Sequence, residues 1–318
     1  MIIKHIEINI WKACNNRCRF CMSSRVWYDE KELTNLEIVK DQIDNYAKNW
    51  YNSIGFLWWD ISIHPNIYEI LSYSKKKWFV WINVITNSMI FDDYKKAERL
   101  VNSWVTRINI SIHSHLVDIE DYLTKIKWWL SRKLLAIDNF NILFKNNILK
   151  SPLSINIVLN WANYKTIVES CLYFWKYKGI NDIRINFIWP RFFDTPKDKK
   201  DLMLTYDDFL PYIKKLIYIS INYNIRITFD SVPACIFYNI DNINYRVLIR
   251  KFLWEQYDHI NEVSNLNKKI VFNWKEHKKN DLKIKTKNCK NCLYLESCEW
   301  IWKEYIEEYW ENEFYSLK

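Results

Sequence analysis

Residues 6–21 read IEINIWKACNNRCRFC, and this stretch joins the two features that decide the fold and the chemistry of the chain. The run IEINI (6–10) alternates apolar and polar residues, which is typical of a β-strand. Three cysteines follow it, Cys14, Cys18 and Cys21, with the spacing C-x3-C-x2-C. We therefore expect a loop that carries three thiols directly after the first strand.

Strand-like and helix-like segments alternate from this loop to about residue 229. Further strands are expected at 53–58, 80–86, 105–113, 153–160, 182–188 and 225–229, and helices at 36–49, 66–77, 92–102, within 118–147, 164–178 and near 205–223. Six βα units in a row predict a parallel sheet, which right-handed crossovers curl. The predicted fold class is α/β, a partial (β/α)6 TIM-like barrel with a small C-terminal cysteine-rich domain. In such a barrel the chemistry lies at the carboxyl ends of the strands, where the cysteine loop is expected.

Composition narrows the class of protein. The hydrophobic fraction of 49% fits a globular chain, and no apolar run is long enough to span a bilayer. The start does not resemble a secretory signal, so a cytoplasmic location with reduced thiols is expected. The net charge of +9 comes from scattered lysines rather than a basic stripe. Neither a membrane nor nucleic acid is therefore an expected partner.

The first cysteine group predicts an iron–sulfur site. Thiolates suit iron–sulfur clusters, and three of them can hold three irons of a [4Fe–4S] cluster. The fourth iron then stays open to a small molecule. The alternative is a zinc knuckle that lacks its fourth ligand.

Several motifs resemble the radical S-adenosylmethionine (SAM) superfamily. The C-x3-C-x2-C spacing after the first strand, with Phe20 before the last cysteine, is that family's signature. The segment FLWWDISIHPNIYEIL (56–71) resembles its F-x-G-G-E-P-x-x-H-P segment. VITNS (84–88) is similar to the T-N-G ending of the third strand, and INISIHS (108–114) to the fourth-strand motif.

The resemblance implies a role for each matching residue. Cys14, Cys18 and Cys21 would bind the cluster and Phe20 would lie by the adenine; the backbone at Trp58 and Trp59 and the carboxylate of Asp60 would meet the methionine amino group, and Asn87, Ser111 and His113 would lie near the SAM ribose and carboxylate. For Ser111 and His113, ordinary hydrogen bonding at a strand end is the alternative. His64 is expected to start a helix before Pro65 rather than to bind a ligand.

The implied reaction begins with an electron from a donor such as a flavodoxin or ferredoxin. The cluster then cleaves SAM reductively into methionine and a 5′-deoxyadenosyl radical, which abstracts a hydrogen atom from the substrate. The chain is thus expected to be an oxidoreductase or maturase. We expect its substrate to be a peptide or another small polar molecule. The alternatives are modification of a nucleotide-derived small molecule, and a non-catalytic metal-binding or electron-transfer protein.

The second cysteine group is CKNCLYLESC (289–298), with the spacing C-x2-C-x5-C. Together with the residues that follow, it resembles the end of a SPASM- or twitch-type auxiliary domain. The resemblance implies a second [4Fe–4S] cluster held by Cys235, Cys289, Cys292 and Cys298, in a domain at 231–318 after a radical SAM core domain at 1–230. A structural zinc site with four cysteine ligands is the alternative. Cys171 lies in an amphipathic helix and is expected to be buried and inert.

Glycine is scarce in this chain. The sequence has 2 Gly and 18 Trp, where about 7% glycine, roughly 22 residues, is usual. Tryptophan stands at positions that favour glycine: Trp58 and Trp59 in the G-G-E-like motif, and Trp78, Trp104, Trp128, Trp129 and Trp189 at turns. Our hypothesis is that most of these codons are UGA and are read as glycine in the native organism. The alternative is a truly tryptophan-rich chain.

Overall fold

The computed structural model describes residues 3–10, 13–21, 34–56, 60–191, 193, 195–238, 240, 244–253, 260–265 and 270–318. In this part of the chain, nine strands form one sheet in the order β7-β6-β5-β4-β3-β2-β1-β8-β9. The strands are β1 (His5–Asn9), β2 (Ser53–Phe56), β3 (Trp81–Thr86), β4 (Arg107–Ser111), β5 (Ser154–Leu159), β6 (Asp182–Phe187), β7 (Arg226–Asp230), β8 (Ile260–Asn265) and β9 (Ile270–Phe272).

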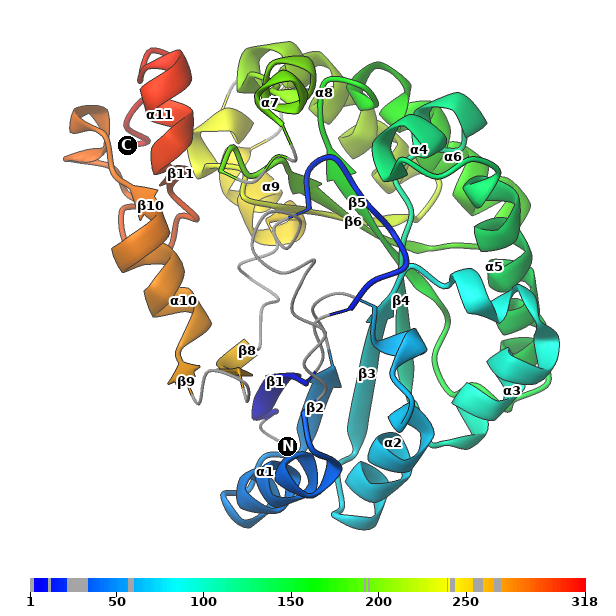
Figure 1. The fold of residues 1–318 in the computed structure, drawn as a ribbon. Helices are drawn as coiled ribbons and strands as arrows, with labels where there is room; N and C mark the ends of the chain where they lie inside the picture. The colour runs from blue at the N-terminus through cyan, green and yellow to red at the C-terminus, as the bar shows by residue number, and fades with distance from the viewer. Residues whose placement is uncertain are drawn as a thin grey trace.

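The prediction of a partial parallel barrel is confirmed. Strands β1 to β7 pair in parallel with their neighbours, in chain order. The helices lie outside the curved sheet (Figure 1). β7 and β9 are the edge strands among the described residues, so the sheet stays open. The helices are α1 (Leu36–Lys48), α2 (Ile67–Lys76), α3 (Tyr94–Asn102), α4 (Val117–Thr124), α5 (Trp129–Lys145), α6 (Ile167–Lys178), α7 (Pro196–Leu202), α8 (Tyr206–Asn222) and α9 (Tyr245–Phe252).

The strands after residue 230 were not expected from the sequence, and two of them belong to the main sheet. β8 pairs with β1 in parallel and β9 pairs with β8 antiparallel, so both extend the main sheet although they come after residue 230. Beyond them lie α10 (Trp274–His277), β10 (Lys283–Ile284), β11 (Ile301–Trp302) and α11 (Lys303–Tyr309), drawn in orange and red in Figure 1. The division of the chain at residue 230 stays a prediction.

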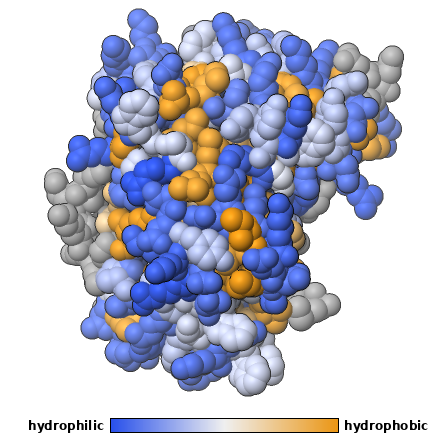
Figure 2. All heavy atoms as spheres, turned by 90° about the vertical axis from the view of Figure 1, so that its right-hand side faces the viewer, coloured by the Kyte–Doolittle hydropathy of each residue, from blue (hydrophilic) through white to orange (hydrophobic). Residues whose placement is uncertain are grey.

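The two faces of the sheet differ in polarity. Toward the helices, Ile6, Ile8, Ile54 and Phe56 are fully buried in the main core. Alternate residues face the concave side, and many of them are polar, as in the pair Asn156 and Asn186. The outer surface of α5 and its neighbours is mostly hydrophilic, with apolar side chains in separate patches (Figure 2). The sheet therefore packs on helices on one side and presents polar groups on the other. None of the helices in the described ranges is long and apolar enough to cross a membrane.

Three helices end on tryptophans with a left-handed backbone. Trp50, Trp78 and Trp104 follow α1, α2 and α3 with φ angles of 63°, 71° and 74°. The amide of Trp78 donates to Lys75 O at 3.1 Å and the next amide, of Phe79, donates to Ser74 O at 3.3 Å. This bond pair is the Schellman motif, which usually ends on glycine.

Gly179 supplies the comparison within the same chain. It ends α6 with φ 66°, and the following amide, of Ile180, donates to Phe174 O at 3.1 Å. Trp50 and Trp78 occupy equivalent positions, with 87% of each residue exposed, so no packing explains an indole there. The structure thus adds a backbone reason for glycine to the compositional one. Other tryptophans with positive φ among the described residues are Trp128, Trp300 and Trp310.

Two further tryptophans of the hypothesis lack this signature. Trp129 opens α5 and Trp189 stacks on Trp302 with ring centroids 4.4 Å apart, and neither has a positive φ. Trp58 and Trp59 lie outside the described residues. The backbone argument for glycine therefore concerns the helix ends and turns.

Replacing Trp50 or Trp78 with glycine should stabilise the protein. A non-glycine residue in the left-handed region costs roughly 1–2 kcal/mol, and little packing is lost from an exposed indole. We expect the free energy of unfolding to rise by about 1 kcal/mol for each change, measured by urea denaturation. Trp175→Gly inside α6 is the matched control and should lower it by about 1 kcal/mol. A loss of stability at both helix ends would contradict the backbone argument.

The recoding hypothesis itself is tested on the native gene and protein. We expect UGA codons at Trp58, Trp59, Trp78, Trp128, Trp129 and Trp189. Tandem mass spectrometry of protein from the native organism should read glycine at these positions. Native peptides that contain tryptophan at 58 and 59 would refute the hypothesis.

Candidate functional site

The three thiols of the cysteine loop follow the carboxyl end of β1, and each is partly buried. The amide of Asn16 donates to Cys14 Sγ at 3.3 Å, and the Asn87 side chain donates to the same sulfur at 3.8 Å. The pKa of Cys18 is raised to about 12, mainly by burial and in addition by the neighbouring Cys21, while Lys133 opposes the shift. Burial also raises the pKa of Cys14 well above its ordinary value, so without bound metal Cys14 and Cys18 keep their protons.

The cysteine loop is fastened to the end of α4. The amides of Arg17 and Arg19 donate to Thr124 O at 3.3 Å and Leu123 O at 2.9 Å. The Arg19 guanidinium donates to Tyr122 O at 2.6 Å. These bonds satisfy carbonyls that a helix C-terminus leaves free. Arg19 also pairs with the buried Asp198 at 2.5 Å, which ties the loop to α7.

Asp60 links the ends of β2 and β3. It is fully buried, and its Oδ1 accepts bonds from the Ser62 amide at 2.9 Å and the Thr86 hydroxyl at 2.8 Å. Its Oδ2 accepts from the Asn87 amide at 3.3 Å, and its own amide donates to Ala13 O at 3.2 Å. The residue therefore also fixes the start of the cysteine loop. The neighbouring site residues Trp58 and Trp59 lie outside the described residues.

His113 lies beside Phe20 just after β4. The two rings meet edge to face with centroids 4.9 Å apart. His113 Nδ1 accepts the amide of Val158 at 3.1 Å, and burial lowers the pKa of the imidazole to about 4. The ring is therefore neutral and carries its proton on Nε2. Ser111, the last residue of β4, is partly buried, and its carbonyl oxygen accepts a hydrogen bond from Lys133 Nζ at 2.9 Å.

A buried ion pair that sequence reasoning missed holds this loop. Glu120 and Lys133 are both fully buried and pair at 2.7 Å. The second oxygen of Glu120 accepts the amides of His113 at 2.7 Å and Ser114 at 2.9 Å. Lys133 also donates to Ser111 O at 2.9 Å. The signal in the sequence is a lysine on the buried face of α5, between Leu130 and Ala136.

His64 lies just before the helix α2, near the helix start that the sequence predicted. It ends the short helix η1 (Ile61–Ile63), and its Nδ1 accepts the amide of Asn66 at 3.1 Å, just before α2. Burial lowers its pKa to about 4. Cys171 is fully buried in α6, and burial raises the pKa of its thiol.

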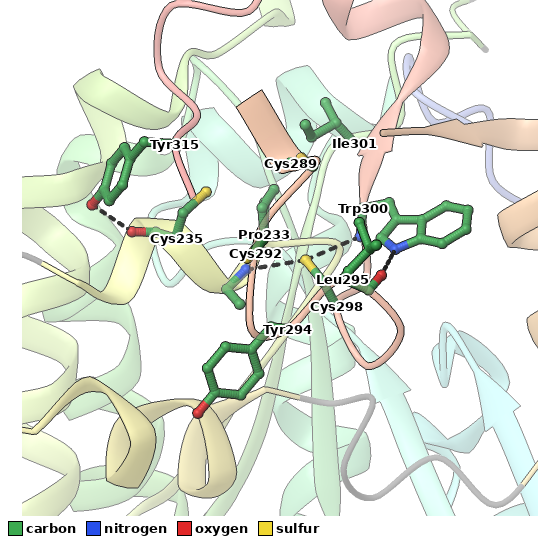
Figure 3. Close-up of a pocket in the computed structure, with 11 residues that line it drawn as sticks. Pro233, Cys235, Cys289, Cys292, Tyr294, Leu295, Cys298, Trp300, Ile301 and Tyr315 are labelled. Carbon is green, nitrogen blue, oxygen red and sulfur yellow. Dashed lines mark hydrogen bonds between the residues drawn. The ribbon is translucent and has the colours of Figure 1, made fainter. Parts of the chain in front are cut away.

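The second set of cysteines lines one pocket (Figure 3). Cys235 comes from η4 (Ala234–Phe237), and the other three, Cys289, Cys292 and Cys298, come from the loop before β11. Backbone amides point at two of the sulfurs: those of Ala234 and Trp300 donate to Cys298 Sγ, each at 3.4 Å, and that of Leu317 donates to Cys292 Sγ at 3.5 Å. The pocket brings together the four thiols that the sequence singled out.

A second buried ion pair fixes this segment to the barrel. Lys283 and Glu299 pair at 3.1 Å with almost no exposure. Glu299 also accepts the amide of Ser231, directly after β7, at 2.7 Å. Glu299 follows Cys298, so the pair anchors one side of the pocket.

Both cysteine sets have the donor chemistry of iron–sulfur ligands, namely thiols with amide donors nearby. Within the described ranges, no three histidine, cysteine, aspartate or glutamate side chains are grouped closely enough to hold one metal ion. The assignment of either set to a cluster therefore rests on thiol chemistry and placement.

Comparison with known proteins gives a family match over part of the chain, and a fold. Residues 8–158 match the Radical SAM superfamily model. No curated protein matches the sequence. The structure of Streptococcus suis SuiB bound to S-adenosylmethionine is similar over all of this chain and 77% of its own, with 13% identity and a TM-score of 0.66.

Two further structures are similar at low identity. Native anSMEcpe with bound AdoMet matches 71% of this chain at 14% identity with a TM-score of 0.55, and this chain spans 63% of its length. Streptococcus suis SuiB bound to precursor peptide SuiA matches 84% of this chain and 58% of its own, at 14% identity and a TM-score of 0.58. At such identities the likeness shows the fold. The family match covers residues 8–158, just under half of the chain, and the structural likeness adds the fold alone.

Proposed function

We propose that this protein is a radical SAM enzyme whose [4Fe–4S] cluster is bound by Cys14, Cys18 and Cys21. The observation that carries the proposal is the contact between Cys14 of the cysteine loop and Asn87, which comes from the end of the neighbouring strand β3. Asn87 reaches Cys14 and also donates to Asn15 at 2.6 Å, and Asp60 holds Asn87 in turn. When bound, such a cluster supplies the electron that splits SAM into methionine and a 5′-deoxyadenosyl radical, which takes a hydrogen atom from the substrate.

The residues around the thiols would bind and orient SAM. Phe20 offers an aromatic edge and His113 a neutral Nε2–H donor on the same side of the loop. Asp60 would supply a carboxylate for the methionine amino group, beside the backbone at 58 and 59. Asn87 and Ser111 complete the set of polar groups at the ends of β3 and β4.

A peptide is the proposed substrate, and residues 231–318 are proposed as an auxiliary domain. The support for a peptide is the fold shared with SuiB, which has been solved with its precursor peptide SuiA. The support for a second [4Fe–4S] cluster is the single pocket lined by four thiols, Cys235, Cys289, Cys292 and Cys298. A flavodoxin or ferredoxin would supply the electron.

Loss of any thiol of the first set should abolish SAM cleavage. In Cys14→Ala, Cys18→Ala and Cys21→Ala, one iron loses its ligand and the cluster becomes unstable. Anaerobically reconstituted and reduced protein is assayed for 5′-deoxyadenosine, and its visible absorbance is recorded. Cys171→Ala, a buried thiol far from both sets in the sequence, is the matched control and should retain cleavage. Cleavage that persists in one of the three variants would refute the ligand assignment.

The second set should bind iron independently of the first. A variant with Cys14, Cys18 and Cys21 all changed to alanine should still contain iron and sulfide after reconstitution, because four thiolates remain in the second pocket. Adding Cys298→Ala should remove most of it. The same variant is also produced in the native host and purified anaerobically. If it then contains zinc and no sulfide, the structural zinc site is favoured.

A further inference from the structure

A glutamate on the concave face of the sheet lies across the backbone of the neighbouring strand. Glu7 of β1 pairs in register with Gly55 of β2, which pairs with Asn83 of β3. A Cβ atom at residue 55 would lie 2.1 Å from Glu7 Oε2 and 2.6 Å from Oε1. Gly55 is one of two glycines in the sequence, and its φ is not in the left-handed region. Glycine at residue 55 therefore leaves room for the Glu7 carboxylate and is not needed for the backbone conformation.

One side of the Glu7 carboxylate is already bonded. Its Oε1 contacts His5 Nε2 at 2.7 Å, and His5 Nδ1 contacts Ser53 Oγ at 2.6 Å. The other oxygen, Oε2, accepts no hydrogen bond from the described residues. It is buried, and only 6% of the residue is exposed to solvent. A buried carboxylate oxygen without a donor is costly, so native proteins rarely leave one.

Three asparagine oxygens on the same face of β1, β3 and β4 also lack a hydrogen-bond donor among the described residues. Asn9 lies two residues after Glu7 on β1, on the same face, and is 1% exposed. Asn83 follows Gly55 in register, and Asn109 pairs with Ile85, two residues beyond Asn83, so it is a diagonal neighbour of Asn83. The Oδ1 atoms of Asn9, Asn83 and Asn109 are buried and accept no bond from the described part of the chain.

We propose that these four residues, Glu7, Asn9, Asn83 and Asn109, form a site for a primary ammonium group of the substrate, here called the acceptor niche. An ammonium carries three donors and no acceptor, which matches a set of acceptor oxygens with one carboxylate. A lysine side chain or a peptide amino terminus would supply it. The acceptor niche lies on the strand face opposite the helices, and β1 leads from it into the cysteine loop. The inference rests on the proposed function, because it assumes that the substrate of the proposed enzyme binds inside the barrel.

The test compares two probes that differ in the ammonium alone. Reconstituted holoenzyme is titrated with Nα-acetyl-lysine amide and with Nα-acetyl-norleucine amide, and binding is measured by calorimetry. The lysine amide should bind about tenfold more tightly, as a charge-assisted hydrogen bond in a buried site predicts. Glu7→Gln, which keeps the size of the side chain, should remove this preference. Glu37→Gln on the exposed surface of α1 is the matched control and should keep it.

Gly55 gives a second, steric arm. Gly55→Ala should displace the Glu7 carboxylate and weaken lysine amide binding about tenfold. If that variant does not fold, Glu7→Ala with Gly55→Ala restores the space, and the double variant should fold without any preference between the probes. Equal binding of the two probes to the wild-type protein, or a preference that survives Glu7→Gln, would overturn the inference. SAM cleavage by the wild-type protein is recorded separately, so its absence would refute the proposed function without deciding the probe comparison.

Discussion

The helix α4 holds the two halves of the candidate SAM site together. At its first turns, the buried carboxylate of Glu120 fixes the amides that follow β4, and with them His113. At its last turn, free carbonyls accept the amides of the cysteine loop. Burial alone would raise the pKa of Glu120, but the Lys133 ammonium and the hydrogen bonds hold it below its usual value, so the carboxylate is charged. Removing one partner of such a buried pair costs about 3–5 kcal/mol, so the geometry of the loop depends on this pair being complete.

Much of the fold could be predicted because its signals are local. The apolar runs that became β1 to β7 alternate with helical patterns, and the cysteine spacing needs no tertiary information. β8 was missed because it pairs with β1 across the whole chain, and a short strand after Pro233 has no regular pattern of its own. The same holds for Lys133 and Arg19: both act through partners in distant segments, and only folding shows that the lysine on the buried face of α5 has a carboxylate to meet.

The placement of the two cysteine sets follows from the topology of a parallel sheet. Cys14 comes a few residues after β1 and Cys235 a few residues after β7, so both follow the carboxyl ends of strands, which lie at one edge of the sheet. The remaining thiols of the second set come from a distant segment, which Lys283 and Glu299 attach to the end of β7. In this parallel sheet, both thiol sets are therefore attached at the carboxyl ends of strands, at the same end of the polar concave face.

The glycine question bears directly on this arrangement. Gly55 and Gly179 stand for the two physical reasons that glycine is needed, close approach of another group and a left-handed backbone. Trp50, Trp78 and Trp104 have the second reason without being glycine. An indole can be tolerated there because the helix ends are exposed, at the cost of backbone strain. The first reason is stricter, since a side chain cannot share space with a bound group. If SAM binds beside residues 58 and 59, as we propose, tryptophan at these positions would compete with it for space. The identity of these two residues would then affect SAM binding more than the identity of the residues at the helix ends.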